Sequence, residues 1–273
     1  MAIALVAVLA FAPIAAVTPA DANDANGIHY YVSLGDSIAA GSQPVIVSDS
    51  DQTSEGYADQ LYASLHANDP KLRLLKLGCG GESTTSMIEG VSDSWPSCDP
   101  RVYKSRYQHG TQLAEAVAFL HAHRQFVDFV TIDIGANDVI GGGGVPAIEA
   151  NLPLILAALR DAVGPGVPIV GMTYYDPFLA QIWFTSFDLV ALQTEANSHV
   201  LNGALENIYG SFGDPVAEVD QAFSNNDTTL QPDGLPLDVQ RICEWTWTCV
   251  AGDIHPNAIG YGVIAKTFEQ SLP

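Results

Sequence analysis

The sequence is poor in basic side chains and in charged side chains as a whole. Its 273 residues include 10 Lys and Arg against 31 Asp and Glu, a formal net charge of −21, and only 15% of the residues are charged. An acidic surface repels phosphate backbones, so we expect no nucleic-acid partner. The 48% share of hydrophobic residues excludes an acidic disordered protein, which would be poor in apolar side chains.

The chain also lacks an apolar run long enough for a clear membrane span. Residues 3–17 are apolar over the length of a signal-peptide core, although no basic residue precedes Lys71. We expect residues 1–22 to be an export signal, cleaved near 20–22, and the alternative is an N-terminal membrane anchor. We expect the mature chain to be secreted and monomeric, to form one domain over 27–273 and to have no stable membrane insertion.

Cysteines are few, and none of the four lies in a Cys-x-x-Cys pair or near a His at zinc-finger spacing. We therefore expect no metal site. Export into an oxidising environment predicts disulfides, and four cysteines allow three pairings. We expect the two pairings that close the shortest loops, Cys79–Cys98 and Cys243–Cys249.

Short apolar, β-branched runs alternate with helical periodicity along the chain. The predicted strands are 28–34, 72–77, 127–134 and 167–173. The predicted helices lie around 58–65 and 113–120, over 151–163 with Asn151 as the N-terminal cap, and over 256–268. This alternation predicts an α/β fold with a parallel sheet sandwiched by helices. Residues 178–209 and 224–249 break the pattern, and we interpret them as insertions over the carboxyl edge of the sheet.

Polar clusters lie at or near the ends of the predicted strands. Gly35-Asp36-Ser37 follows the first, Gly81-Glu82-Ser83-Thr84 the second and Gly135-Ala136-Asn137-Asp138 the third, and Gly252-Asp253-Ile254-His255-Pro256 opens the last helix. Since parallel strands end at one edge of a sheet, these residues can converge. Ser, Gly, Asn and His supply what acyl transfer requires: a nucleophile, oxyanion donors and a base.

These four motifs, in this order from Ser33 to about Ile264, resemble the SGNH (GDSL) hydrolase family, and in particular its secreted lipase- and esterase-like members. The resemblance implies a three-layer α/β/α sandwich with a flavodoxin-like sheet, and ester hydrolysis without a cofactor. Position 39 is Ala, so Ser37 does not lie in the Gly-x-Ser-x-Gly elbow of α/β-hydrolases.

The resemblance also implies roles for single residues. Ser37 would be the nucleophile, and its own N–H, the Gly81 N–H and the Asn137 side chain would bind the oxyanion. His255 would act as the base. The family usually places Asp three residues before this His, whereas here Asp253 lies two before it. Either Asp253 or a backbone carbonyl then orients the imidazole.

An aromatic segment gives a first indication of the substrate. Phe178, Trp183, Phe184 and Phe187 would line an acyl pocket or form a lid, and the alternative is ordinary helix core. We expect a serine esterase or lipase that cleaves carboxylic esters of small molecules or lipids. The alternatives are a carbohydrate acetylesterase and a catalytically silent module that binds carbohydrate or lipid.

Overall fold

A computed structural model of the chain describes residues 27–44, 53–90, 107–185 and 188–273, apart from the side chains of 181, 182 and 184–195. The expected export signal and Cys98 lie outside the described residues.

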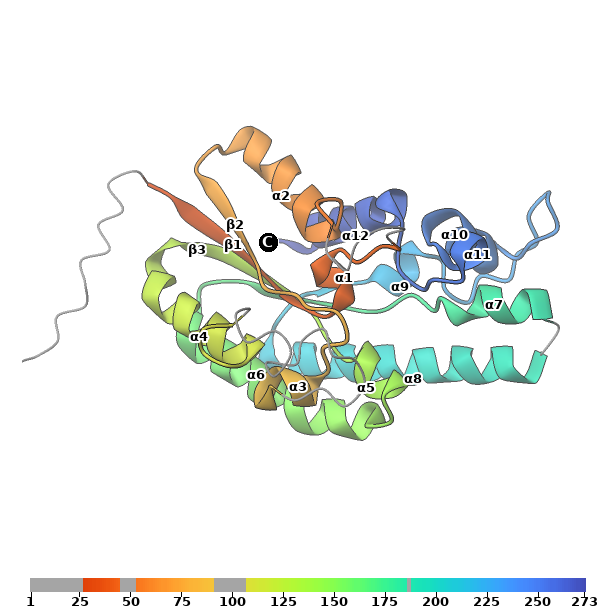
Figure 1. Cartoon of the computed structure of the whole chain (residues 1–273), viewed down its shortest axis with the longest axis horizontal. Helices are drawn as coiled ribbons and strands as arrows, with labels where there is room; N and C mark the ends of the chain where they lie inside the picture. The colour runs from red at the N-terminus through yellow and green to blue at the C-terminus, as the bar shows by residue number, and fades with distance from the viewer. Residues whose placement is uncertain (1–26, 45–52, 91–106, 186–187) are drawn as a thin grey trace, which may run out of the picture.

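The centre of the molecule is a parallel sheet with strand order β2-β1-β3-β4-β5 (Figure 1). Its strands are β1 (His29–Gly35), β2 (Leu72–Lys76), β3 (Val127–Asp133), β4 (Ile169–Met172) and β5 (Val216–Ala217). Val32, Leu34, Val130 and Ile132 in the two central strands are fully buried, as expected for strands covered on both faces. The predicted α/β fold is confirmed.

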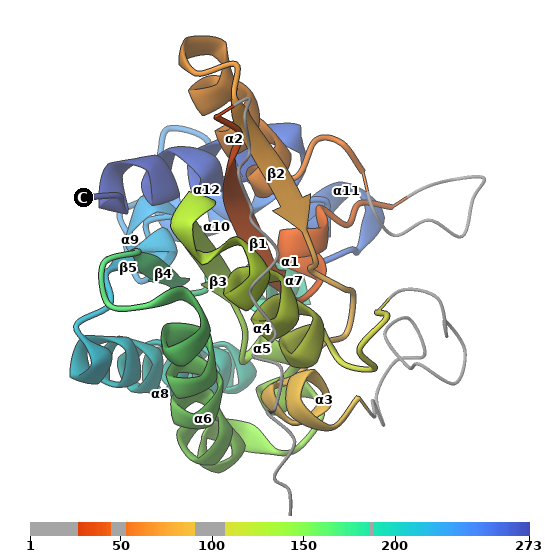
Figure 2. The same ribbon diagram turned by 90° about the vertical axis from the view of Figure 1, so that its left-hand side faces the viewer.

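Helices cover both faces of the sheet (Figure 2). On one face α2 (Tyr57–Asn68) and α12 (Ala258–Ser271) pack against each other, and the Tyr57 ring stacks on Phe268 with centroids 4.7 Å apart. On the other face α6 (Gly144–Val163) packs between α4 (Gln112–His123) and α8 (Asp188–Phe212). This three-layer arrangement buries the apolar stripe of each helix against the strands.

Shorter helices follow the strand ends or lie beyond them. These are α1 (Ser37–Ala40), α3 (Thr84–Glu89), η1 (Arg124–Phe126), α5 (Ala136–Ile140), α7 (Phe178–Thr185), α9 (Val219–Ala222), α10 (Leu237–Trp245) and α11 (Thr248–Ala251). Figure 1 shows α7, α10 and α11 beyond the carboxyl ends of the strands. The expected disulfide Cys243–Cys249 joins α10 to α11 with a Cα–Cα distance of 5.1 Å, which confirms that pairing.

The expected start of one helix is wrong. The helix predicted from Asn151 begins two turns earlier, at Gly144, so Asn151 lies inside it and does not cap it. Packing explains the difference, because Ile148 and Leu152 are fully buried and Asn151 donates hydrogen bonds to the hydroxyls of Thr84 and Thr85. Tertiary contacts therefore outweigh the local capping signal.

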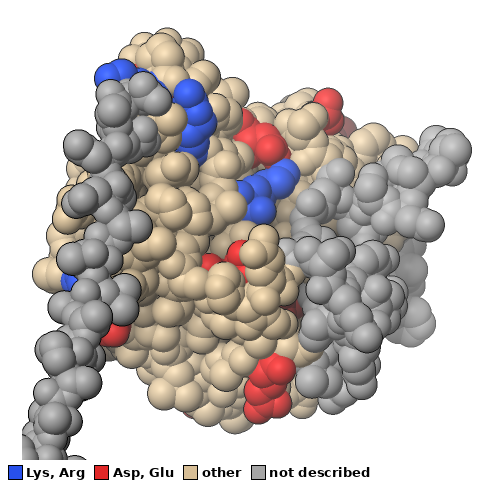
Figure 3. All heavy atoms as spheres, turned by 60° about the vertical axis from the view of Figure 1, so that its left-hand side comes forward, with Lys and Arg blue, Asp and Glu red and all other residues tan. Residues whose placement is uncertain are grey.

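The surface carries few charges on the face shown in Figure 3, where Asp and Glu side chains are scattered among uncharged ones. Within the described ranges, no helix combines the length and the apolar character that crossing a membrane requires.

Candidate active site

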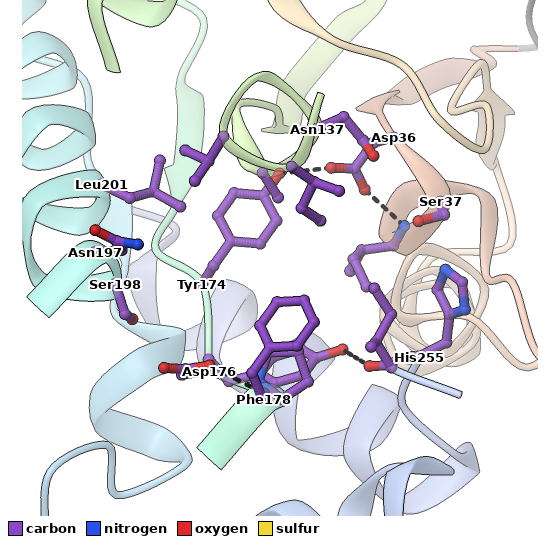
Figure 4. A pocket seen from close by; sticks show the side chains of 17 residues that line it. Asp36, Ser37, Asn137, Tyr174, Asp176, Phe178, Asn197, Ser198, Leu201 and His255 are labelled. Atoms are coloured by element: carbon purple, nitrogen blue, oxygen red, sulfur yellow. Dashed lines mark hydrogen bonds between the residues drawn. The ribbon is translucent and has the colours of Figure 1, made fainter. Parts of the chain in front are cut away.

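A cavity of about 350 Å³ opens at the carboxyl ends of β1 and β3, and Ser37, Asn137 and His255 all line it (Figure 4). The chain leaves these two adjacent strands in opposite directions. From β1 it continues to β2 on one side of the sheet, and from β3 it continues to β4 on the other side. Parallel sheets leave a crevice at such a switch point, and ligands bind there. The fold therefore brings together three residues that are 100 and 118 positions apart in sequence.

Ser37 is the first residue of α1, and its neighbours fix the start of that helix. The Asp36 carboxylate accepts the N–H of Ile38 at 2.8 Å, and the Asp133 carboxyl accepts the N–H of Ala39 at 3.1 Å. Within the described part of the chain, no acceptor takes the N–H of Ser37. That amide is the donor that remains available at the N-terminus of α1.

Gly35 is required for this geometry. Its φ is +135°, and a Cβ on it would lie 2.2 Å from the Asp133 carbonyl oxygen. Only glycine lets β1 end this close to β3. The Gly-Asp-Ser motif therefore needs its glycine because β1 and β3 approach each other closely at this position.

His255 has a carboxylate partner. One oxygen of Asp253 lies 2.7 Å from Nδ1 of His255 and also accepts the His255 N–H at 2.9 Å. Burial acts to raise the pKa of Asp253, but the hydrogen bonds from the His255 ring and amide outweigh it and lower the pKa below its usual value. Asp253 is therefore ionised at neutral pH. Of the two expected orienting groups, this geometry favours the Asp253 carboxylate.

The loop before α12 is held in place by residues that the sequence analysis missed. Tyr175 donates its hydroxyl to the carbonyl of Ile254 at 2.8 Å, and the Trp247 N–H donates to the carbonyl of His255 at 3.0 Å. Tyr174 and Tyr175 come just after β4, so the strand-end argument that found Ser37 and Asn137 also points to them.

Asn137 is anchored by the neighbouring loop. Its Nδ2 donates to the carbonyl of Glu82 at 2.9 Å, which leaves a second N–H on the same nitrogen. Asp138 ties the two loops together by accepting from the N–H and hydroxyl of Thr84 at 2.9 and 2.6 Å. Gly81 is buried in this loop with φ +77°, and it is not one of the residues that line the cavity.

The cavity wall is mainly apolar. Polar groups lie on the side away from Ser37 and His255, where the cavity is lined by Asp176, Asn197 and Ser198 (Figure 4). The apolar and aromatic side chains of the wall are those of Ile38, Val139, Ile140, Tyr174, Phe178, Leu201 and Ile254. Of the four aromatic candidates, Phe178 lines the cavity and Trp183 is 46% exposed and does not. The side chains of Phe184 and Phe187 lie outside the described residues.

No group of three or more His, Cys, Asp or Glu side chains suited to a metal ion occurs in the ranges that the structure describes. The chemistry that this arrangement can perform is nucleophilic acyl transfer, in which a serine, a supported imidazole and nearby N–H donors act together.

Several solved structures share this fold at low sequence identity. An acetyl xylan esterase, AlAXEase, is 13% identical with a TM-score of 0.57 and covers 89% of this chain and 100% of its own. Phospholipase A1 from Streptomyces albidoflavus NA297 is 16% identical with a TM-score of 0.54, covering 89% and 99%. Est24, a carbohydrate acetylesterase from Sinorhizobium meliloti, is 13% identical with a TM-score of 0.53, covering 89% and 97%.

Comparison with curated protein sequences gives no match. The sequence profile of the GDSL-like Lipase/Acylhydrolase family, in contrast, matches residues 33–263, nearly the whole described chain. The match includes the motifs of Ser37, Gly81, Asn137 and His255 in the expected order. The chain belongs to the GDSL-like lipase/acylhydrolase family, a family of esterases and lipases.

Proposed function

We propose that this protein is an exported serine hydrolase that cleaves carboxylic esters through an acyl-enzyme on Ser37. The observation that carries the proposal is the meeting of Ser37, Asn137 and the Asp253-supported His255 in one mainly apolar cavity. Each supplies a different part of acyl transfer, and each comes from a different strand end or loop.

The first step forms the acyl-enzyme. His255 Nε2 takes the proton of the Ser37 hydroxyl while Oγ attacks the ester carbonyl carbon. Asp253 accepts the Nδ1–H, which fixes the tautomer with a free lone pair on Nε2 and stabilises the imidazolium that forms. The tetrahedral intermediate then expels the alcohol, which receives the proton from His255.

The oxyanion of that intermediate is stabilised by N–H donors. The Ser37 amide and the second N–H of Asn137 Nδ2 are available at the cavity, and the Gly81 amide is the third proposed donor. In the second step His255 activates water, which attacks the acyl carbon and releases the acid and free Ser37.

The lining and the volume of the cavity favour esters of longer acyl chains over acetylated polysaccharide as the substrate. Its apolar wall suits an aliphatic chain, and its volume of about 350 Å³ exceeds the size of an acetyl group. Trp245 and Trp247 have rings of the kind that stack on sugars, but both make other contacts. Arg241 lies over the Trp245 ring at 4.5 Å, and Trp247 donates its indole N–H to Gln43 at 3.1 Å.

Export is part of the proposal and rests on two features of the chain. Residues 1–22 have the apolar character of a signal, and the disulfide Cys243–Cys249 suits an oxidising compartment. N-terminal sequencing of the protein from the medium of its native host should begin near residues 20–22. Retention of the whole chain in the cell would contradict export.

The test of the enzymatic proposal is hydrolysis of p-nitrophenyl esters, from acetyl to palmitoyl, by the oxidised chain and by Ser37→Ala. We expect hydrolysis that the substitution abolishes, with a preference for chains longer than acetyl. A preference for acetyl would favour the carbohydrate acetylesterase. No hydrolysis by the folded protein would favour the silent binding module.

A further inference from the structure

Two carboxyl groups are buried together behind Ser37. Asp36 directly precedes Ser37, Asp133 ends the neighbouring strand β3, and their exposed fractions are 1% and 0%. Their carboxyls accept hydrogen bonds from the adjacent amides of Ile38 and Ala39, so the two acids lie next to each other. Two ionised carboxylates this close and shielded from water repel each other, which favours a proton on one of the two.

The pair also binds both amides that follow Ser37. Asp36 accepts from Ile38, Asp133 accepts from Ala39, and the main chains are joined by the Asp36 N–H donating to the Asp133 carbonyl at 3.1 Å. The first turn of α1 is therefore fixed by these two side chains. What remains for a substrate oxygen is the Ser37 amide.

In the part of the chain that the structure describes, the hydrogen bonds to the pair from other side chains come from tyrosines and not from Lys or Arg. Tyr57 on α2 donates its hydroxyl to Asp133 at 2.7 Å, and Tyr174 after β4 donates to Asp36 at 2.9 Å. The other titratable groups that interact with the pair are Tyr31 on β1, Tyr209 on α8, Tyr261 on α12, Tyr175 and His255. Among the described residues no Lys or Arg hydrogen-bonds either carboxyl. Two negative charges there would repel each other without compensation.

We propose that Asp36 and Asp133 share a single proton, held on Asp133, and act as positioning residues that keep the Ser37 amide available to the oxyanion. The role in catalysis rests on the proposed function, whereas the shared proton does not. A protonated Asp133 limits the charge behind the oxyanion site to one, and that charge remains on Asp36.

The electrostatics of the pair agree with this assignment. Burial raises the pKa of both carboxyls, and the charge of Asp36 raises that of Asp133 further, to well above its usual value. The charge of His255 acts in the opposite direction and lowers the pKa of Asp36. The negative charge of Asp36 is attracted to the positive charge that His255 carries during the reaction.

Infrared difference spectroscopy tests the shared proton without any substrate. At neutral pH the difference spectrum of wild type minus Asp133→Asn should show a carboxylic-acid C=O band that shifts in D₂O, because the band of the partly protonated Glu218, whose pKa is about 7, cancels in the subtraction. The control is Asp69→Asn, because the Lys71 N–H lowers the pKa of the exposed Asp69 and keeps it ionised. Absence of the band from this difference spectrum would overturn the shared proton even if esterase activity is present.

Kinetics test the positioning role. Asn at position 133 replaces a neutral acid by a neutral amide, so kcat should stay within about tenfold of wild type, whereas Asp36→Asn removes the remaining charge and should lower kcat about a hundredfold. KM should change little in both. In the wild type, loss of the Asp133 proton at alkaline pH should lower kcat. This decline should be flatter in Asp133→Asn, because the amide has no such proton to lose. Equal losses in the two variants, with both folded by circular dichroism, would overturn the assignment of the proton to Asp133.

Discussion

A single carboxylate oxygen of Asp253 holds both the ring and the backbone of His255, at 2.7 Å from Nδ1 and 2.9 Å from the amide nitrogen. A spacing of two residues therefore suffices for an acid to reach the imidazole that follows it. The carboxylate and the amide form a local turn, so the ring is oriented from its own loop rather than from a neighbouring strand.

Replacing Asp253 by Asn should lower kcat by about 10⁴-fold, because an amide at this position favours the tautomer with the hydrogen on Nε2. The measurement is kcat and KM on the preferred p-nitrophenyl ester. A loss below about tenfold would mean that a backbone carbonyl is sufficient to orient His255. Thermal unfolding of the variant separates this effect from misfolding.

Asn137 is expected to act mainly in the transition state. Asn137→Ala removes one oxyanion donor, so kcat should fall about a hundred- to a thousand-fold with little change in KM. Asn197→Ala makes the same chemical change on the far side of the cavity and serves as the control. Equal effects of both substitutions on kcat would remove Asn137 from the oxyanion site.

Chain-length preference should depend on the far end of the cavity. Ser198 lines the cavity and its neighbour His199 is exposed and does not. Ser198→Trp should fill this end and lower kcat/KM for long-chain esters while leaving the acetyl ester nearly unchanged. His199→Trp should leave the whole profile as in the wild type. Loss on every ester in Ser198→Trp would place the acyl chain elsewhere.

Stability should depend on pH through Glu218. Burial, followed by the charges of Glu206 and Asp220, raises the pKa of Glu218 from 4.5 to about 7. The folded chain then holds this proton more tightly than the unfolded chain, so stability falls as pH rises from about 4.5 to 7. Glu218→Gln should raise Tm at about pH 8 and have no such effect near pH 4.5.

The control for this prediction is Glu89→Gln, which removes one charge from an exposed position at the end of α3. It tests whether making the net charge of −21 less negative by one is by itself sufficient to raise Tm. A similar gain in Tm from both variants would assign the effect to net charge and not to Glu218.

The sequence was sufficient to predict the strands that position the site, because buried parallel strands are short apolar runs with a polar residue where each ends. Ser37 and Asn137 follow β1 and β3 as expected. The buried role of Asp133 was not predicted, since a single acid at a strand end has no local sign that a second carboxyl lies against it. That contact depends on the order of β1 and β3 in the sheet.

Two other features depended on packing that local patterns do not contain. The start of α6 follows from burial of Ile148 and Leu152 and not from the capping preference of Asn151. Strand β5 has only two residues, Val216 and Ala217, and a run this short has no detectable period. Tyr175 was overlooked because its hydroxyl acts on the loop of His255, 80 positions away.

The central claim is that Ser37 is a nucleophile activated by His255, and covalent trapping tests it most directly. The oxidised chain is incubated with a p-nitrophenyl alkylphosphonate, the released p-nitrophenolate is counted, and the modified peptide is identified by mass spectrometry. We predict one equivalent released per chain and an adduct on Ser37, with both lost in Ser37→Ala and strongly slowed in His255→Ala. An adduct on another residue, or equal release by Ser37→Ala, would contradict the account.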